Sequence, residues 1–200
     1  MRIGILGGTF NPPHIGHTHA AEAAKKALGL DTVLFVPAGL PPHKTIPEDS
    51  ATGEQRMEMA RLAAESIGAE VNDIEFKRPG KSYTAETLRL LKEEYPQAQF
   101  WLIMGTDMFL SIHTWYRPAD IFSAANIAVV AREAMSADAI IVQREKLERE
   151  FGARIDLIDT EVLEISSTQL RCDGSIASEY LCQPVREYIL KKRLYQNSEV

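Results

Sequence analysis

The sequence holds only two cysteines, Cys172 and Cys182, among its 200 residues. Two thiols cannot build a disulfide framework or a four-cysteine zinc site, so we interpret both as buried or half-buried thiols in a reducing compartment. No apolar run approaches the roughly 20 residues of a membrane span, and nothing after Met1 resembles a signal peptide. These absences predict a soluble, cytoplasmic protein.

A net positive charge is also missing, because 28 acidic residues outnumber 22 basic ones and leave a formal net charge of −6. A general DNA- or RNA-binding protein needs a basic surface, so we expect no nucleic-acid partner. Apolar residues at 45% and charged residues at 25% are typical of a globular protein. We expect one domain over 1–200, whose C-terminal helical part, about 166–195, completes an active site, and a homo-oligomer is compatible with these totals.

The first glycine-rich stretch matches neither the dinucleotide-binding Gly-x-Gly-x-x-Gly nor the Walker loop with Gly-Lys-Ser/Thr. Hydride transfer with a dinucleotide and P-loop chemistry therefore lose support. A short apolar run, Ile3–Leu6, instead predicts a buried strand of a parallel sheet, which Gly7 and Gly8 end. A polar turn over 11–13 then leads to a helix whose small and apolar residues recur at helical spacing over 15–28.

Two histidines stand at the start of this helix, where a phosphate chain would be well held. A helix N-terminus offers unpaired N–H groups and a partial positive charge, and Gly8 and Gly16 let a ligand come close. His14 and His17 are three residues apart, so they share a helix face and can reach one phosphate. The alternative is a tight turn in which His14 is a structural cap while His17 and His19 are solvated.

Further apolar and amphipathic stretches continue the alternation of strand and helix. The first strand, the helix and a second strand over 32–36 imply parallel pairing with a right-handed crossover. We expect an α/β protein: a Rossmann-like doubly wound parallel sheet with helices on both faces, in which the strand over 100–104 is central and ligands bind at the carboxyl ends of the strands. The other expected elements are strands over 71–76, 126–130, 154–158 and 162–165, and helices over 54–67 (N-cap Thr52), 85–94, 108–112, 136–151 and 184–194.

Several polar residues follow strands at that edge, and each has a functional and a structural interpretation. Lys44, in a proline-rich loop over 37–44, brings a cation to a phosphate or is a solvated lysine. Asp107, two residues after Gly105, accepts hydrogen bonds from a ribose or is the N-cap of the next helix. Arg132 follows another strand and can bind a phosphate through two N–H groups.

Two aromatic residues and a threonine in the middle of the chain are further candidates. Trp115 and Tyr116, on a loop, can stack on a flat heteroaromatic ring, or they plug the edge of the core. Thr84 stands in the turn cluster before the helix over 85–94, so it is a candidate helix cap. A helix N-terminus also suits a carboxylate, so both roles can hold at once.

A second polar cluster, Ile165-Ser166-Ser167-Thr168-Gln169-Leu170-Arg171, stands at the end of the last expected strand. Its hydroxyl groups are ordinary helix caps. Three hydroxyl groups with exposed N–H groups also make a phosphate site, and Arg171, three residues after Thr168, lies on the same side of the helix.

Both clusters resemble the motifs of one enzyme superfamily. The stretch Gly7-Gly8-Thr9-Phe10-Asn11-Pro12-Pro13-His14-Ile15-Gly16-His17 is similar to the opening motif of the nucleotidyltransferases with a His-x-Gly-His signature, and the second cluster is similar to their Ile-Ser-Ser-Thr-x-x-Arg motif. Within them the chain most resembles the bacterial nicotinate-nucleotide adenylyltransferases over nearly its whole length. Further matches are Ser82-Tyr83-Thr84 with Thr87-Leu88, Gly105-x-Asp107, and Lys44 in a Pro-x-His-Lys context, while Arg132-Glu133-Ala134 departs from the family's Arg-Pro-Gly.

The resemblance implies transfer of AMP from ATP to nicotinate mononucleotide, which gives deamido-NAD and pyrophosphate in NAD biosynthesis, with Mg²⁺ carried by ATP. His17 and His14 would be catalytic, and Thr168 and Arg171 would hold the β- and γ-phosphates. The implied ATP-binding residues are Gly7, Gly8, Thr9, Phe10, His14, Gly16, His17, Gly105, Asp107, Ser166, Ser167, Thr168 and Arg171. The implied nicotinate-nucleotide-binding residues are Gly8, Thr9, Lys44, Thr84, Trp115, Tyr116 and Arg132.

Three alternatives stay open at this point. A sister transferase would act on another acceptor, such as phosphopantetheine or nicotinamide mononucleotide, against which Thr84, Trp115 and Tyr116 argue. A nucleotide-binding sensor without turnover would be expected to lack His17 or Arg171. A class I aminoacyl-tRNA synthetase shares the His-Ile-Gly-His loop, but this chain is short and acidic and has no Lys-Met-Ser-Lys-Ser loop.

Overall fold

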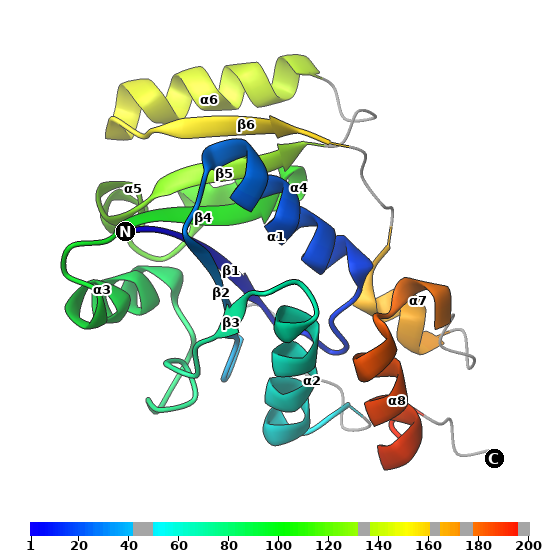
Figure 1. Cartoon of the computed structure of the whole chain (residues 1–200). Helices are drawn as coiled ribbons and strands as arrows, with labels where there is room; N and C mark the ends of the chain where they lie inside the picture. Colours follow the sequence, from blue (N-terminus) through cyan, green and yellow to red (C-terminus); the bar gives the residue numbers. More distant parts are fainter. Residues whose placement is uncertain (42–49, 132–136, 161–164, 173–177, 196–200) are drawn as a thin grey trace.

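The computed structural model describes residues 1–41, 50–131, 137–160, 165–172 and 178–195. Over these residues the chain forms a six-stranded sheet in which all neighbouring strands pair in parallel. The strands are β1 (Arg2–Gly8), β2 (Thr32–Pro37), β3 (Glu70–Val71), β4 (Gln99–Gly105), β5 (Asn126–Ala131) and β6 (Ile155–Asp159). Their spatial order, β3-β2-β1-β4-β5-β6 (Figure 1), is that of a doubly wound Rossmann-like sheet, so the predicted fold class is confirmed.

Helices cover both faces of the sheet, and two more pack beside it. The helices of one face are α1 (Ile15–Leu28) and α2 (Gly53–Glu65). Those of the other face are α3 (Thr84–Glu94), α4 (Thr106–Ser111), α5 (Pro118–Ala124) and α6 (Ala137–Phe151), with the 3-10 turn η1 (Ile112–Thr114). A third buried cluster joins α2 to α7 (Ser167–Cys172), the 3-10 turn η2 (Ser178–Tyr180) and α8 (Gln183–Lys192).

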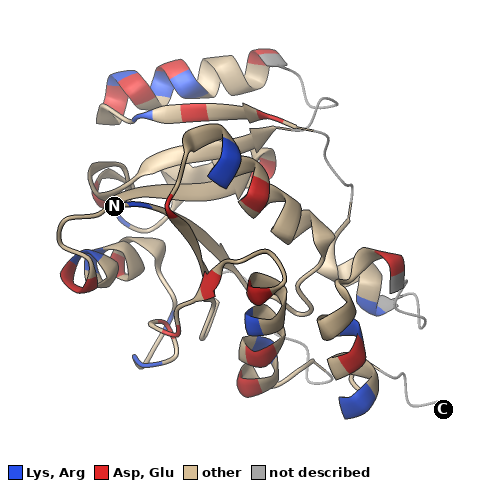
Figure 2. Ribbon diagram, in the orientation of Figure 1, with Lys and Arg blue, Asp and Glu red and all other residues tan. Residues whose placement is uncertain are grey.

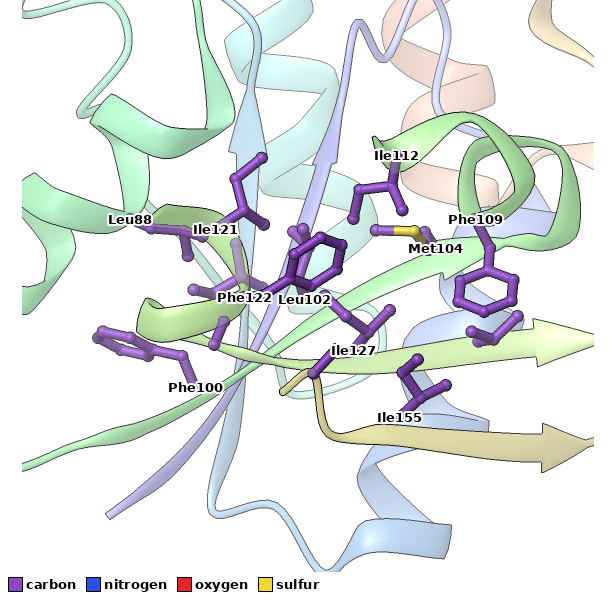
Figure 3. Close-up of a cluster of buried hydrophobic side chains, with 14 of the residues drawn as sticks. Leu88, Phe100, Leu102, Met104, Phe109, Ile112, Ile121, Phe122, Ile127 and Ile155 are labelled. Atoms are coloured by element: carbon purple, nitrogen blue, oxygen red, sulfur yellow. The ribbon is translucent and has the colours of Figure 1, made fainter. Parts of the chain in front are cut away.

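The central strand β4 has an apolar sequence throughout, and its position in the sheet explains this. Successive side chains of a strand point to opposite faces, and here both faces are covered. Phe100, Leu102 and Met104 belong to the buried cluster under α3 to α6 (Figure 3). Trp101 and Ile103 belong to the cluster under α1 and α2. The predicted central position of this strand is therefore confirmed.

The order of the strands places the ligand-binding edge. The chain moves from β1 outward to β2 and β3, then returns with β4 to the other side of β1. Such a switch point, at the carboxyl ends of the strands, is where this fold binds its ligands. The loops that leave β1 and β4 start there, and Figure 1 shows α2, α7 and α8 gathered around the loop after β1.

The strand expected over 71–76 is wrong beyond its first residue, because β3 ends at Val71. Side-chain and main-chain bonds close a turn immediately afterwards. The Asn72 Oδ1 accepts the N–H of Ile74 at 2.9 Å, and the next main-chain bond, from the N–H of Phe76 to the carbonyl of Asp73, is also 2.9 Å. An asparagine that bonds its own backbone two residues on favours a turn over a strand.

The ends of several helices also differ from the predicted ones. The helix expected over 54–67 runs from Gly53 to Glu65, and its expected N-cap is confirmed, since Thr52 accepts the N–H of Gln55 at 3.3 Å. The last helix begins at Gln183, one residue before Pro184. Residues 162–164 of the strand expected over 162–165 lie outside the described residues, and Ile165 is not part of a strand.

The surface of the helices carries charges of both signs, as expected for solvated faces. Figure 2 shows them mixed along α2, α6 and α8, while the central strands are almost free of charge in this view. On α6 the expected i,i+4 pairing occurs between Arg144 and Glu148 at 2.7 Å. Cys182 is a half-buried free thiol, as predicted. In the described ranges, no helix has both the length and the apolar character that crossing a membrane requires.

Candidate active site

The loop between β1 and α1 contains a residue in an uncommon conformation. Phe10 has φ 49°, in the left-handed region that side chains other than glycine rarely adopt. The residue is 1% exposed, and its ring stacks on that of Phe35 at 5.3 Å between centroids and meets the ring of His17 edge-on at 5.1 Å. Strained backbone persists where its surroundings over-determine it, and here the buried ring supplies part of that constraint.

His14 and His17 stand together at the first turn of α1. Their rings are 3.8 Å apart between centroids, so the prediction that they share one face is confirmed. His14 is the N-cap residue, and its main-chain N–H donates to the Nδ1 of His17 at 3.1 Å. His17 is half-buried, and the Nε2 of His19 lies 2.8 Å from the hydroxyl of Thr160. The alternative with His17 and His19 as solvated side chains is therefore wrong, while the role of His14 as a cap holds.

Burial decides the protonation of the His14 ring, and a hydrogen bond decides the tautomer of the neutral His17 ring. Burial lowers the pKa of His14 from 6.5 to about 4, so this ring is neutral at pH 7. In His17, the Nδ1 accepts a hydrogen bond and therefore carries no proton when the ring is neutral. The remaining proton of His17 then sits on Nε2, which makes Nε2–H the donor that the loop orients.

The second motif is bonded directly to this loop, although about 155 residues separate them. The hydroxyl of Ser167 donates to the carbonyl of Pro12 at 2.8 Å. The Nη1 of Arg171 donates to the carbonyl of Asn11 at 2.6 Å, and its Nη2 reaches the hydroxyl of Thr168 at 3.4 Å. The C-terminal part of the chain therefore contacts the His-x-Gly-His loop, and the main-chain carbonyls of Asn11 and Pro12 are the points of contact.

Ser166 takes the structural role that the sequence left open. Its Oγ accepts the N–H of Gln169 at 3.2 Å, and the Gln169 Oε1 accepts the N–H of Ser166 at 2.9 Å. This reciprocal pair is a capping box at the start of α7. Thr168 is exposed and Arg171 half-buried, so both side chains are accessible to a phosphate.

Gly105 and Asp107 lie at the end of β4 as expected, but one interpretation of Asp107 is wrong. Gly105 is the N-cap of α4, and Asp107 lies in the first turn with an exposed side chain. The alternative in which Asp107 is the N-cap is therefore wrong. A Cβ atom added to Gly105 or to Gly7 would meet no atom within 4 Å, so space is open above both central strands.

The candidates for the acceptor lie around the start of α3. The N-cap of this helix is Tyr83, so Thr84 is its first residue and the expectation of Thr84 as the cap is wrong. The ring of Tyr83 lies 4.5 Å from that of Tyr116, which is 49% exposed. Trp115 is half-buried against the core cluster, so it plugs the core edge as one interpretation had it. Lys44 and Arg132 lie outside the described residues.

Some residues at the site were missed by the sequence analysis. Arg56 of α2 donates to the carbonyl of Thr9 at 2.9 Å, and the hydroxyl of Tyr195 donates to the Asn11 Oδ1 at 2.7 Å. Burial raises the pKa of the Tyr195 hydroxyl well above its usual value. One signal was present, because Arg56 precedes the buried Met59 and Ala60 at helical spacing and so lies on the apolar face of α2.

A protein-held metal centre does not emerge from the residues in place. Across the described ranges there is no group of three or more His, Cys, Asp or Glu side chains that could hold a metal ion. We therefore assign no protein ligands to a divalent cation.

Comparison with known sequences identifies the family. Residues 5–173 match the family model described as "Cytidylyltransferase-like". Proteins named "Probable nicotinate-nucleotide adenylyltransferase" are similar over the full length. The one from Exiguobacterium sibiricum is 39% identical and the alignment covers 98% of this chain and 99% of that protein, and the one from Geobacter sulfurreducens is 40% identical with 98% of each covered. The one from Gloeobacter violaceus is 41% identical, with 97% of this chain and 96% of that protein covered.

Comparison with solved structures supports the same fold. The nicotinic acid mononucleotide adenylyltransferase of Plasmodium falciparum complexed with NaAD superposes with a TM-score of 0.76 at 20% identity, with 99% of both chains covered. At that identity the likeness bears on the fold alone, whereas the sequence matches decide the family. With its two motifs bonded to one another at the switch point of the sheet, the chain belongs to the cytidylyltransferase-like family and, within it, to the nicotinate-nucleotide adenylyltransferases.

Proposed function

We propose that the protein transfers AMP from ATP to nicotinate mononucleotide, giving deamido-NAD and pyrophosphate in NAD biosynthesis. The observation that carries this proposal is the His14–His17 pair, 3.8 Å apart at the start of α1, on a loop that Ser167 and Arg171 hold from the second motif. Family membership supplies the substrates, because the relatives over the full length bear the name of this activity.

The reaction requires little covalent chemistry from the protein. A phosphate oxygen of the acceptor attacks the α-phosphorus of ATP, and the bond from that phosphorus to the bridging oxygen breaks. The electron pair leaves with pyrophosphate. The second pKa of a phosphate monoester is near 6, so the attacking oxygen is already ionised at pH 7 and no general base is needed. Catalysis then consists of positioning and charge stabilisation.

We assign the phosphate contacts to the two motifs. The Nε2–H of His17 donates to the α-phosphate as charge grows there, and neutral His14 contacts the phosphate chain. Arg171 holds the loop through Nη1 and offers N–H groups of Nη2 to the β- and γ-phosphates, beside the hydroxyl of Thr168. The remaining proposed ATP contacts are Gly7, Gly8, Thr9, Phe10, Gly16, Gly105, Asp107, Ser166 and Ser167.

The acceptor is proposed to bind between the β1 loop and the start of α3. Tyr116, steadied by Tyr83 at 4.5 Å, offers a ring face to the nicotinate ring, and Thr84 in the first turn of α3 offers a hydroxyl and an N–H to its carboxylate. Trp115, Lys44, Arg132, Gly8 and Thr9 complete the proposed set. Mg²⁺, carried by ATP, would neutralise phosphate charge. We further propose that the chain acts as one domain in the cytoplasm.

The test is the release of pyrophosphate from ATP and Mg²⁺ with each acceptor supplied separately. Release with nicotinate mononucleotide, well above that with nicotinamide mononucleotide or phosphopantetheine, would support both the reaction and the acceptor site. Release only with another acceptor would keep the phosphate chemistry and refute the acceptor assignment. No release with any acceptor, together with measurable ATP binding, would favour a nucleotide sensor.

A further inference from the structure

Arg56 is a buried cation beside the proposed site. It lies on α2 and is 2% exposed, on the same helix face as the buried Met59, Ala60 and Ala63. Within the part of the chain that the structure describes, no carboxylate lies within ion-pair distance of it. Taking a charge out of water costs several kcal/mol unless other groups compensate it, so hydrogen bonds must stabilise this buried guanidinium.

Its hydrogen bonds to the described residues all end on main-chain carbonyls of two loops. Nη1 donates to the carbonyls of Thr9, at 2.9 Å, and Ala38, at 2.7 Å, and Nη2 donates to that of Gly39 at 3.2 Å. Thr9 follows β1, and Ala38 and Gly39 follow β2, the neighbouring strand. One planar group with several N–H donors therefore joins the carboxyl ends of two strands.

The bond to Thr9 sets the direction of a donor in the phosphate loop. The peptide that contains the carbonyl of Thr9 also contains the N–H of Phe10, and in a planar trans peptide the two point in opposite directions. Arg56 draws the carbonyl toward α2, so the N–H of Phe10 is directed away from it. The positive φ of Phe10, 49°, would not hold without such constraints.

The bonds to Ala38 and Gly39 extend this constraint toward the acceptor. While Arg56 holds the carbonyls of this turn, the buried hydroxyl of Ser82 accepts the N–H of Gly39 at 3.1 Å and that of Leu40 at 3.2 Å. Ser82 lies two residues before Thr84. A continuous set of hydrogen bonds thus runs from the loop proposed for ATP to the helix start proposed for the acceptor.

We propose that Arg56 is a positioning residue for the transfer reaction: through the carbonyls of Thr9, Ala38 and Gly39 it fixes the distance between the two bound substrates. The inference rests on the proposed function. In this role Arg56 touches neither substrate, and its positive charge, which pairs with no carboxylate among the described residues, also favours phosphates bound nearby. An arginine with only a structural role would affect stability and leave the kinetics of the folded enzyme unchanged.

The test compares Arg56→Lys with Arg61→Gln, a matched control one turn further along the exposed side of α2, where Arg61 pairs with Glu58 and Glu65. Lysine keeps the charge but concentrates its donors on one nitrogen, so it cannot hold the carbonyls of both loops. A misplacement of about 1 Å can cost about 10²-fold. We expect kcat to fall by about that factor in Arg56→Lys, with KM for ATP changed by less than about threefold, and Arg61→Gln to behave as wild type.

Circular dichroism and thermal unfolding show whether each variant is folded, and kcat and KM are compared only for folded protein. A folded Arg56→Lys enzyme with wild-type kcat would overturn the inference. If Arg56→Lys does not fold, Ser82→Ala decides, because it releases the same turn from the other side: a raised KM for nicotinate mononucleotide with lowered kcat supports the inference, and wild-type kinetics overturn it. Absence of pyrophosphate release from the wild-type protein would instead refute the proposed function, and the role of Arg56 with it.

Discussion

Replacing His17 with asparagine separates the two hydrogen bonds that the imidazole makes in the proposed mechanism. The Nδ1 accepts the N–H of His14 at 3.1 Å, and the carboxamide oxygen of asparagine can take over that bond from nearly the same place. The Nε2–H donor is then missing. Losing one preorganised donor to a transition-state oxygen costs about 10²–10³ in kcat, or about 2.7–4 kcal/mol. We expect a modest change in KM, because the contact forms mainly in the transition state.

The assay is pyrophosphate release with ATP, Mg²⁺ and nicotinate mononucleotide at saturation. His17→Ala lacks both hydrogen bonds, so it should show a similar loss in kcat and, in thermal unfolding, a further loss of about 1 kcal/mol from the unsatisfied N–H of His14. His17→Gln, whose amide nitrogen comes near the position of Nε2, should recover part of kcat. Wild-type kcat in His17→Asn would show that Nε2–H is not needed and would refute the reasoning.

Three further predictions use other parts of the site. Burial lowers the pKa of His14 from 6.5 to about 4, so between these pH values the unfolded chain binds a proton that the folded protein does not. The free energy of unfolding should therefore fall as pH drops through this window, by up to about 3 kcal/mol. Unfolding of His14→Gln should lack this pH dependence. Tyr116→Ala should raise KM for nicotinate mononucleotide by about 2- to 10-fold through lost ring stacking, and an equal rise in KM for ATP would argue against the acceptor assignment. Gly39→Ala would put a Cβ atom 2.6 Å from the carbonyl oxygen of Glu75, so it should lower the free energy of unfolding by about 1–3 kcal/mol, whereas an unchanged Tm would contradict the close contact.

The first half of the site could be predicted because its determinants are close together in the chain. The apolar run after Met1, the two glycines and the helical recurrence of small residues specify a strand, a loop and a helix by spacing alone. The three-residue separation of His14 and His17 then specifies a shared face, and their rings do lie 3.8 Å apart. The same local logic predicted a helix cap among the hydroxyl groups of the second cluster, and the structure assigns the capping box to Ser166.

Other features were not specified by residue spacing alone. Asp107 was a plausible helix cap by spacing, but Gly105 is the N-cap, because the helix begins directly where β4 ends. Thr84 was displaced from the cap position by Tyr83 in the same way. The contact of Tyr83 with Tyr116 depends on how α3 lies beside the loop after η1, and no local pattern contains that arrangement.

The sequence by itself determined the class of fold, the strand–loop–helix unit and the residue types that we propose to contact the phosphates. This was possible because the hydrogen bonds of helices and turns join residues that are near in the chain, so the spacing of apolar residues indicates these elements. Only the tertiary structure decided that Arg171 holds the carbonyl of Asn11 and that Arg56 holds that of Thr9. Those bonds join residues 160 and 47 positions apart, and they exist only because packing brings α7 and α2 to the same loop.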